Sequence, residues 1–202
     1  MPARIDYDYI ETHVPQGACV LDLGCGDGAL LLELSRRKGC DVLGVEIDEQ
    51  AVGKCITRGL PVYHGDMLEA MGMFADGHFD CVVLSQTLQQ VLDPVRVMEE
   101  MLRVGRKAIV SFPNFGHWRW RLQLLLKGRA PLTPALPCQW YDTPNIRVLT
   151  VRDFARFCRE HGLRVVDHIF FSLSFRRVPA LAANLLAASA VFVLERPSAA
   201  SR

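Results

Sequence analysis

The sequence predicts an α/β fold in which a mostly parallel sheet of seven strands carries helices on both faces. Two observations support this prediction. Short apolar runs suited to buried strands alternate with helix-like segments from Cys19 to Phe112, and the first strand meets its helix through three glycines, Gly24, Gly26 and Gly28. With 202 residues, 50% hydrophobic and 22% charged, we expect one domain over residues 1–202.

The first half of the chain is expected to supply three strands and three helices. Arg36, Arg37 and Lys38 followed by Gly39 are typical of a helix end, because cations favour the last turn and glycine adopts the left-handed conformation beyond it. The expected segments are a helix over residues 6–13, a strand over 19–23, a helix over 29–38, a strand over 42–45, a helix over 49–58 and a strand over 61–64.

The second half is expected to supply four more strands. Pro94 suits the first turn of a helix, and Thr150 with Asp153 resembles a capping box at a helix start. The apolar residues 178–194 are interrupted by Pro179 and are interpreted as a short helix leading into a strand. The other expected segments are strands over 79–84, 107–112, 164–174 and 190–195, and helices over 94–104 and 150–162.

An insertion with a different character lies at about residues 113–149. Residues 122–126 give part of it a helical core face, and three prolines, Pro131, Pro134 and Pro137, predict an ordered loop. Trp, Tyr and Arg anchor protein interfaces, so the insertion is either a lid or a docking surface. A pocket for a small cation and an RNA surface are further alternatives. The candidate substrate or partner residues are Asn114, His117, Trp118, Arg119, Trp140 and Tyr141.

Composition argues against several functions and locations. The net charge of +1 gives no support for a nucleic-acid partner. Seven cysteines without a C-x-x-C pair support neither a disulfide framework nor a zinc site, so we expect no metal and a reducing compartment. The start of the chain lacks the apolar run of a signal peptide, and no stretch reaches the ~20 apolar residues of a membrane span. We therefore expect a cytoplasmic protein with no membrane segment.

Polar residues follow the predicted strands, at the edge where ligands of parallel sheets lie. Glu46 stands about 20 residues beyond the first glycine, where an acid can accept the hydroxyls of a ribose. Asp66, between Gly65 and Met67, offers a carboxylate for an adenine amino group beside an apolar side chain. Ile47 either packs on the adenine or belongs to the core.

The fourth and fifth predicted strands add further polar residues at the same edge. Ser85 and Gln86 leave the fourth strand, and Asn114 follows the fifth, where it could contact a substrate. With the glycine loop, these residues form one constellation. It is a site for a nucleotide-like cofactor, because glycines let the backbone approach a ligand and a helix N-terminus offers free N–H groups.

The glycine loop alone leaves the cofactor open. Gly24, Gly26 and Ala29 fit the G-x-G-x-x-A pattern of dinucleotide binding. Asp22, two residues before the first glycine, disfavours a pyrophosphate and favours an ammonium or sulfonium. Cys25 lies inside the loop and is interpreted as a small residue that allows close backbone approach, the alternative being a reactive thiol.

The string Asp22-Leu-Gly-Cys-Gly-Asp-Gly28 resembles the cofactor motif of class I S-adenosylmethionine-dependent methyltransferases. Glu46, Asp66 and Ser85 stand in matching places, and the last two strands resemble the terminal antiparallel pair of that Rossmann-like fold. More narrowly, five strings resemble the methionine-biosynthesis protein MetW family. They are Leu84-Ser-Gln-Thr-Leu88, Met101-Leu-Arg-Val-Gly105, Ser111-Phe-Pro-Asn-Phe-Gly-His-Trp118, Arg121-Leu-Gln-Leu-Leu125 and Trp140-Tyr-Asp-Thr-Pro-Asn-Ile146.

The resemblance implies a cytosolic protein of methionine biosynthesis that binds S-adenosylmethionine or S-adenosylhomocysteine and is a partner or activator of homoserine O-acyltransferase. Two alternatives stay open: an active methyltransferase on a small molecule or protein, and an NAD-dependent oxidoreductase. The expected cofactor-binding residues are Asp22, Gly24, Cys25, Gly26, Glu46, Ile47, Gly65, Asp66, Met67, Ser85 and Gln86.

Overall fold

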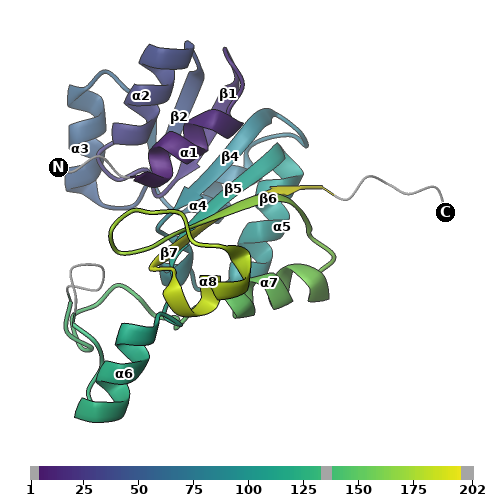
Figure 1. Ribbon diagram of the computed structural model, residues 1–202. Helices are drawn as coiled ribbons and strands as arrows, with labels where there is room; N and C mark the ends of the chain where they lie inside the picture. Colours follow the sequence, from purple (N-terminus) through teal and green to yellow (C-terminus); the bar gives the residue numbers. More distant parts are fainter. Residues whose placement is uncertain (1–4, 133–137, 197–202) are drawn as a thin grey trace.

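A sheet of seven strands in the order β3-β2-β1-β4-β5-β7-β6 forms the centre of the computed structural model, which describes residues 5–132 and 138–196 (Figure 1). Strands β1 to β5 pair in parallel, whereas β7 pairs antiparallel with both β5 and β6. The prediction of a mostly parallel seven-stranded sheet is confirmed. The strands are β1 (Cys19–Leu23), β2 (Asp41–Glu46), β3 (Val62–His64), β4 (Phe79–Ser85), β5 (Gly105–Pro113), β6 (Arg164–Phe171) and β7 (Ser189–Glu195).

Helices cover both faces of this sheet (Figure 1). Buried residues of α1, α2 and α3 pack on one face, and those of α4, α5, α7 and α8 pack on the other. The helices are α1 (Ile5–His13), α2 (Ala29–Lys38), α3 (Glu49–Thr57), α4 (Met67–Gly72), α5 (Pro94–Val104), α6 (Trp118–Lys127), α7 (Val151–Glu160) and α8 (Ala180–Leu186), with a 3-10 turn η1 (Leu88–Gln90). No helix in the described ranges is both long and apolar enough to cross a membrane.

The predicted helix signals act locally as expected. Gly39 ends α2 in the left-handed conformation, with φ 59°. Asp93 accepts the Arg96 N–H and Pro94 occupies the first turn of α5. Thr150 accepts the Asp153 N–H at 3.2 Å and so begins α7. These caps satisfy N–H and C=O groups that a helix end leaves without partners.

Strand order reverses between β1 and β4, so ligand contacts are expected in the crevice above this pair. The carboxyl ends of β1, β2, β3 and β4 all reach this edge, which we call the cofactor edge. The antiparallel β7 distinguishes the sheet from the 3-2-1-4-5-6 parallel order of the dinucleotide-binding fold. The topology therefore argues against the nicotinamide alternative.

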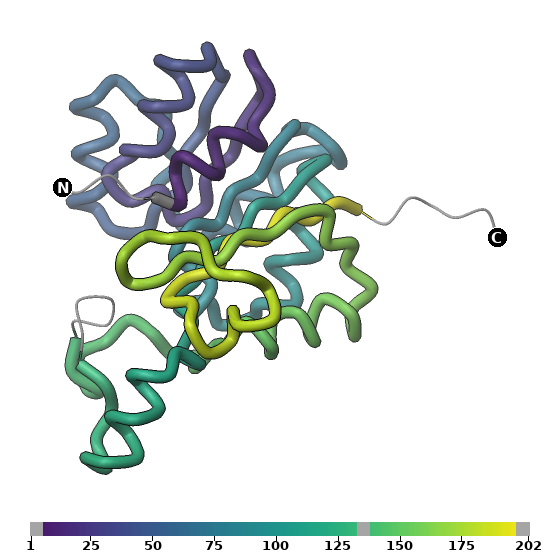
Figure 2. The backbone as a smooth tube through the Cα atoms, viewed as in Figure 1, coloured from purple at the N-terminus to yellow at the C-terminus, as the bar shows by residue number. Residues whose placement is uncertain are grey.

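The helix α6 projects away from the sheet, and the chain then returns along it as a loop (Figures 1 and 2). We call residues 118–132 and 138–149 the arm. The predicted core face of residues 122–126 is wrong, because α6 has little contact with any other described helix or strand. Leu124, Leu125 and Leu126 are 56%, 80% and 73% exposed, and in α6 only Trp120 is buried. Pro134 and Pro137 lie outside the described residues.

Three local features differ from the sequence prediction. Helix α4 and the turn η1 were not expected, because both are too short to show a clear period. Strand β6 ends at Phe171, three residues before the predicted end at Ser174. There the chain turns back, with Ser172 N–H bonded to the Arg176 carbonyl at 2.9 Å.

Candidate cofactor site

A cavity of about 540 Å³ opens at the cofactor edge. Eight of the eleven predicted cofactor residues line it: Gly24, Glu46, Ile47, Gly65, Asp66, Met67, Ser85 and Gln86. The sequence prediction missed the wall formed by residues 87–93, of which Thr87, Gln90, Val91, Leu92 and Asp93 line the cavity. The available signals were their position directly after Ser85 and Gln86 and the family-like string that ends at Leu88.

Glu46 organises the glycine loop at the end of β2. Its Oε2 accepts the Gly26 N–H at 2.8 Å, and its Oε1 accepts the N–H groups of Ile47 and Asp48 at 2.8 and 3.0 Å. These bonds occupy three of the about four acceptor positions of a carboxylate. One acceptor position is left, so two ribose hydroxyls could bind this carboxylate only if at least one backbone N–H gave up its bond. The Gly26 N–H, in the glycine loop, is one of the three candidates.

Gly24 sets the distance between β1 and the wall of residues 87–93. Its φ is +70°, and a Cβ there would lie 2.8 Å from Cγ2 and Oγ1 of Thr87. Thr87 in turn donates its hydroxyl to the Ser85 carbonyl at 3.0 Å. A larger residue at position 24 would be strained and would separate the two strand ends at the cavity floor.

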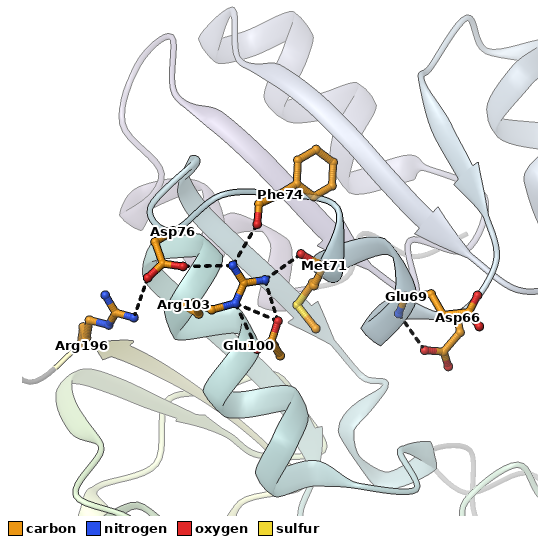
Figure 3. Close-up of polar contacts among 8 residues, drawn as sticks. All are labelled: Asp66, Glu69, Met71, Phe74, Asp76, Glu100, Arg103 and Arg196. Carbon is orange, nitrogen blue, oxygen red and sulfur yellow. Dashed lines mark hydrogen bonds and ion pairs between the residues drawn. The ribbon is translucent and has the colours of Figure 1, made fainter.

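Asp66 joins the cavity to α4. Its Oδ1 caps the helix by accepting the Leu68 N–H at 2.7 Å and the Glu69 N–H at 3.3 Å, the second of which is drawn in Figure 3. Both bonds use one oxygen, so the second carboxylate oxygen is without a hydrogen bond to any described residue. A ligand amino group could be accepted there without breaking the cap.

Arg103 fixes the other end of α4 (Figure 3). Its guanidinium donates to the carbonyls of Met71 and Phe74, each at 2.9 Å, and forms ion pairs with Glu100 at 2.7 Å and Asp76 at 3.1 Å. The guanidinium holds the pKa of Asp76 below its ordinary value. This network ties the end of α4 to α5, and Asp66 caps its start. Helix α4, which brings Met67 to the cavity, is therefore held at both ends.

A buried polar cluster supports the β4 side of the cavity. The hydroxyls of Ser85 and Ser111 donate to the Asp6 carboxylate at 2.9 and 3.0 Å, and Gln86 Nε2 donates to Ser111 Oγ at 3.1 Å. Gln86 has a φ of 56°, which is uncommon for a residue other than glycine. Sequence spacing gave no signal for Asp6, because it lies 79 positions from Ser85.

Three predicted cofactor residues do not line the cavity. Asp22 is buried at the end of β1, and Gly26 contributes its N–H to Glu46. The Cys25 side chain lies against α3, with its Sγ 3.9 Å from that of Cys55. Burial, reinforced by the nearby Asp22, raises the pKa of the Cys25 thiol, which disfavours the reactive thiolate. The Cys25 side chain packs closely on Gly44, since a Cβ on Gly44 would lie 2.5 Å from the Cys25 Sγ, which is consistent with a small residue at position 25.

The structure corrects the expected substrate contact at Asn114. This side chain is fully buried, and its amide donates to the carbonyls of Ala183, Asn184 and Ala187 at 3.2, 3.3 and 2.7 Å. Its oxygen accepts the N–H groups of Gly116 and Val151 at 3.0 and 3.2 Å. Asn114 is therefore the joint between β5, the start of α7, the end of α8 and the arm.

His117 belongs to the root of the arm. It is buried and caps α6 by accepting the Arg119 N–H on Nδ1 at 3.3 Å. Burial, with a smaller contribution from the Arg119 charge, lowers the pKa of His117 below its ordinary value. The imidazole is thus held in the neutral form that can accept this bond.

The other predicted surface residues lie on the arm and do not line the cavity. Trp118 is 41% exposed and carries the Arg119 guanidinium 5.4 Å above its ring. Trp140 and Tyr141 are 77% and 72% exposed and pack edge to face on each other.

Two exposed apolar side chains, Ile47 and Leu92, line the cavity, so the core alternative for Ile47 is wrong.

The cavity suits a nucleoside-like ligand. Carboxylates at Glu46 and Asp66 can accept hydroxyl and amino donors, and the apolar side chains of Ile47 and Leu92 can contact a flat ring. Within the described part of the chain, no three His, Cys, Asp or Glu side chains lie close enough together to hold a metal ion.

Sequence comparisons link the chain to methionine biosynthesis. Residues 4–194 match the family described as "Methionine biosynthesis protein MetW". A bifunctional methionine biosynthesis protein MetXA/MetW from Rhodopirellula baltica is 34% identical over 204 residues, which cover 96% of this chain and 33% of the relative. The chain thus spans about a third of that relative's length. A ubiquinone biosynthesis O-methyltransferase from Aromatoleum aromaticum is 28% identical over 159 residues, 75% of this chain and 66% of the relative.

A solved structure has the same fold. The crystal structure of a SAM-dependent methyltransferase from Archaeoglobus fulgidus matches with a TM-score of 0.66 and 16% identity, over 94% of each chain. This likeness covers nearly the whole chain, and it confirms the class I methyltransferase fold.

Proposed function

Because the chain belongs to the methionine biosynthesis protein MetW family, we propose that it is a cytosolic S-adenosylmethionine-binding protein that docks on homoserine O-acyltransferase and activates it. The observation that carries the accessory role is the arm, which presents apolar side chains to solvent on a helix that packs on little else. The name of the MetXA/MetW relative, which joins two proteins in one chain, supports such an association.

The cavity supports the cofactor part of the proposal. Glu46 would accept ribose hydroxyls in exchange for the Gly26 N–H, and the free oxygen of Asp66 would accept the adenine amino group. Ile47 and Leu92 would flank the ring, and the buried Asp22 would favour a cationic ligand over a pyrophosphate. S-adenosylmethionine supplies a sulfonium with an electrophilic methyl group, and S-adenosylhomocysteine would use the same adenosine contacts.

The arm supports docking over a lid. A lid would bury its apolar face on the cavity, yet Leu125 and Leu126 are 80% and 73% exposed in this structure. Large exposed apolar patches mark interaction sites, and Trp, Tyr and Arg anchor them. Trp140, Tyr141 and Arg119 add these residue types to the same arm, which supports docking of a partner on it.

Three measurements test the proposal. The chain is titrated with S-adenosylmethionine and, separately, with NAD by calorimetry. It is also co-purified with the homoserine O-acyltransferase of its own organism, and acyl transfer is assayed with and without it. Heat with S-adenosylmethionine, a complex and a higher acylation rate are expected. Binding of NAD alone would overturn the cofactor, and unchanged acylation without a complex would overturn the accessory role.

Methyl transfer is the second candidate function, and one observation favours it. Gln86 holds a left-handed conformation on the cavity wall, and strained residues of this kind cluster at active sites. An aligned acceptor needs little from the protein beyond positioning and a base. Conversion of S-adenosylmethionine to S-adenosylhomocysteine with the acyltransferase present, above the rate without it, would support this function.

A further inference from the structure

The loop that returns from the arm contacts the wall of the cofactor cavity from outside. Residues 87–93 form this wall, and five of them line the cavity. Ile146 and Arg147, at the end of the arm, pack beside the wall without lining the cavity themselves. The arm and the cavity, which the proposed function uses separately, therefore share one structural element.

Backbone and side-chain bonds make this contact specific. The N–H groups of Ile146 and Arg147 both donate to the Gln89 carbonyl, at 3.0 and 3.1 Å. The Arg147 guanidinium donates from Nε to the Val91 carbonyl at 2.9 Å and from Nη2 to the Leu92 carbonyl. Arginine presents these donors in a rigid planar fork, so one side chain fixes two consecutive carbonyls of the wall.

Gln89 connects the arm to a residue that lines the cavity. This residue is buried, and its Nε2 donates to the Gln86 carbonyl at 2.7 Å. Gln86 is the left-handed residue that lines the cavity and bonds to Ser111. A continuous set of hydrogen bonds thus runs from the arm through Gln89 to the floor of the cavity.

The root of the arm holds its two ends together. The Phe115 N–H donates to the Leu149 carbonyl at 2.9 Å, beside the Asn114 joint. The outgoing and returning segments are therefore fixed as a pair two residues beyond Arg147. Within the returning segment, the Arg147 contacts lie between this fixed root and residues 138–145, so a partner that moves residues 138–145 acts on the Arg147 contacts.

We propose that Arg147 is a positioning residue that holds the cavity wall and links occupancy of the cofactor site to engagement of the arm. This inference rests on the proposed function, because it needs both a cofactor and a docking partner. A ligand that contacts residues 90–93 favours the wall position that Arg147 holds, and a partner that favours the same arm position then strengthens ligand binding. By linkage, the ligand strengthens partner binding by the same factor.

The first test measures S-adenosylmethionine affinity by calorimetry in the full chain. Arg147→Ala is expected to raise the dissociation constant about 5- to 20-fold, although Arg147 does not line the cavity. Arg147→Lys keeps the charge but loses the fork, so a similar rise is expected. Arg156→Ala is the matched control, since Arg156 is an exposed arginine on α7 with ion pairs to Asp153 and Glu160. It is expected to bind within twofold of wild type.

A second readout follows the arm without any partner. Amide hydrogen exchange of residues 118–127 and 138–149 is compared with and without S-adenosylmethionine. Protection of the arm on ligand binding is expected in wild type and in Arg156→Ala, and is expected to be lost in Arg147→Ala and Arg147→Lys. Far-ultraviolet circular dichroism and the melting temperature establish that each variant folds.

The third readout is the linkage itself. In wild type, a saturating concentration of the acyltransferase is expected to change the S-adenosylmethionine dissociation constant at least about fivefold, and Arg147→Ala is expected to bring this factor close to one. If wild type binds no S-adenosylmethionine or no acyltransferase, the proposed function fails. If wild type binds both but the Arg147 variants keep wild-type affinity and coupling, only this inference is overturned.

Discussion

The cofactor edge and the arm differ in how far their side chains are engaged by the rest of the fold. At the cofactor edge, the Glu46 carboxylate accepts three backbone N–H groups and Asp66 caps α4, so the polar groups are organised before any ligand arrives. On the arm, Leu125, Leu126 and Trp140 face solvent with no described element covering them. The polar groups of the first region are held in place by backbone bonds, whereas the apolar side chains of the second are left exposed.

This difference has a thermodynamic meaning. A preorganised site loses little conformational entropy on binding, so small ligands gain affinity there. Burying exposed apolar surface contributes a favourable free energy of about 25 cal/mol per Å², which favours association with another protein. The two regions should therefore respond to mutation independently, except where Arg147 joins them.

The largest expected effect is a loss of S-adenosylmethionine affinity when a glycine of the cofactor edge, but not one elsewhere in the fold, is replaced by valine. Gly26 and Gly39 share a left-handed φ, +58° and +59°, and a Cβ at either would meet no atom within 4 Å. Valine at each is expected to cost about 1–2 kcal/mol of folding free energy. Only Gly26→Val is expected to weaken S-adenosylmethionine binding, by about 100-fold or more, because Gly26 belongs to the loop that bonds to Glu46 and a valine side chain would fill the space through which this backbone approaches a ligand.

Calorimetry and thermal unfolding measure the two variants side by side. Binding by Gly26→Val within twofold of Gly39→Val would contradict a cofactor role for the glycine loop. Retained binding of the acyltransferase by Gly26→Val would sharpen the separation of the two regions.

The next effect concerns the arm. Leu125→Ser with Leu126→Ser is expected to weaken acyltransferase binding about 30-fold, a cost of about 2 kcal/mol typical of interface anchors. The free energy of unfolding should change by less than about 0.5 kcal/mol per site, because both side chains are already exposed. Leu181→Ser is the matched control, because Leu181 is an exposed leucine on α8. A loss confined to Leu181→Ser would move the docking surface from the arm to α8.

A smaller effect separates the ligand role of Asp66 from its capping role. Asparagine caps a helix as well as aspartate, so Asp66→Asn should keep α4 intact. Loss of the charge is expected to weaken S-adenosylmethionine binding about tenfold, or about 1.4 kcal/mol. Asp48→Asn is the control, since Asp48 caps α3 at 2.8 Å but does not line the cavity. Equal affinities of the two variants would exclude Asp66 as a ligand contact.

The smallest effect concerns pH at the root of the arm. The pKa of His117 is lowered from its ordinary 6.5, so the folded state favours the neutral form. Its contribution is complete above pH 6.5 and is lost as the pH falls through the lower folded pKa, because the unfolded chain then binds the proton first. His117→Asn keeps a capping acceptor but does not titrate. From pH 7 to pH 5 its free energy of unfolding should therefore fall less than that of wild type, with a difference between the two of under about 1 kcal/mol.

Denaturant unfolding at several pH values checks this expectation. His161→Asn is the control, because His161 is an exposed residue at the end of α7. If wild type and His117→Asn lose the same stability on acidification, His117 is not the group responsible.

Local signals in the sequence predicted the elements well. The helix over residues 29–38 and the helix over 94–104 have the predicted bounds, because Gly39, Asp93 and Pro94 act within one turn of the chain. Glu46 and Asp66 were found because parallel strands bring their carboxyl ends to one edge whatever the details of packing. The family was likewise predictable, since its strings are contiguous in the chain.

Long-range contacts could not be predicted in this way. Asn114 was expected to meet a substrate, but its partners at residues 183–187 come from a helix about 70 positions later. The leucines of α6 had a core-like pattern, yet the fold brings no surface to cover them. Residues 89–93 belong to no string that the sequence singled out, and their position as a cavity wall depends on long-range contacts such as those between Arg147 and the carbonyls of Gln89 and Val91.

The sequence alone therefore determined the fold class, the strand ends that face the cofactor edge and the family. These follow from periodicity, capping and contiguous motifs, which act over a few residues. Only the tertiary structure decided that Asn114 is a joint, that the arm stands apart from the sheet and that Arg147 joins the arm to the cavity wall. Those features depend on which distant segments meet, and that is set by packing of the whole chain.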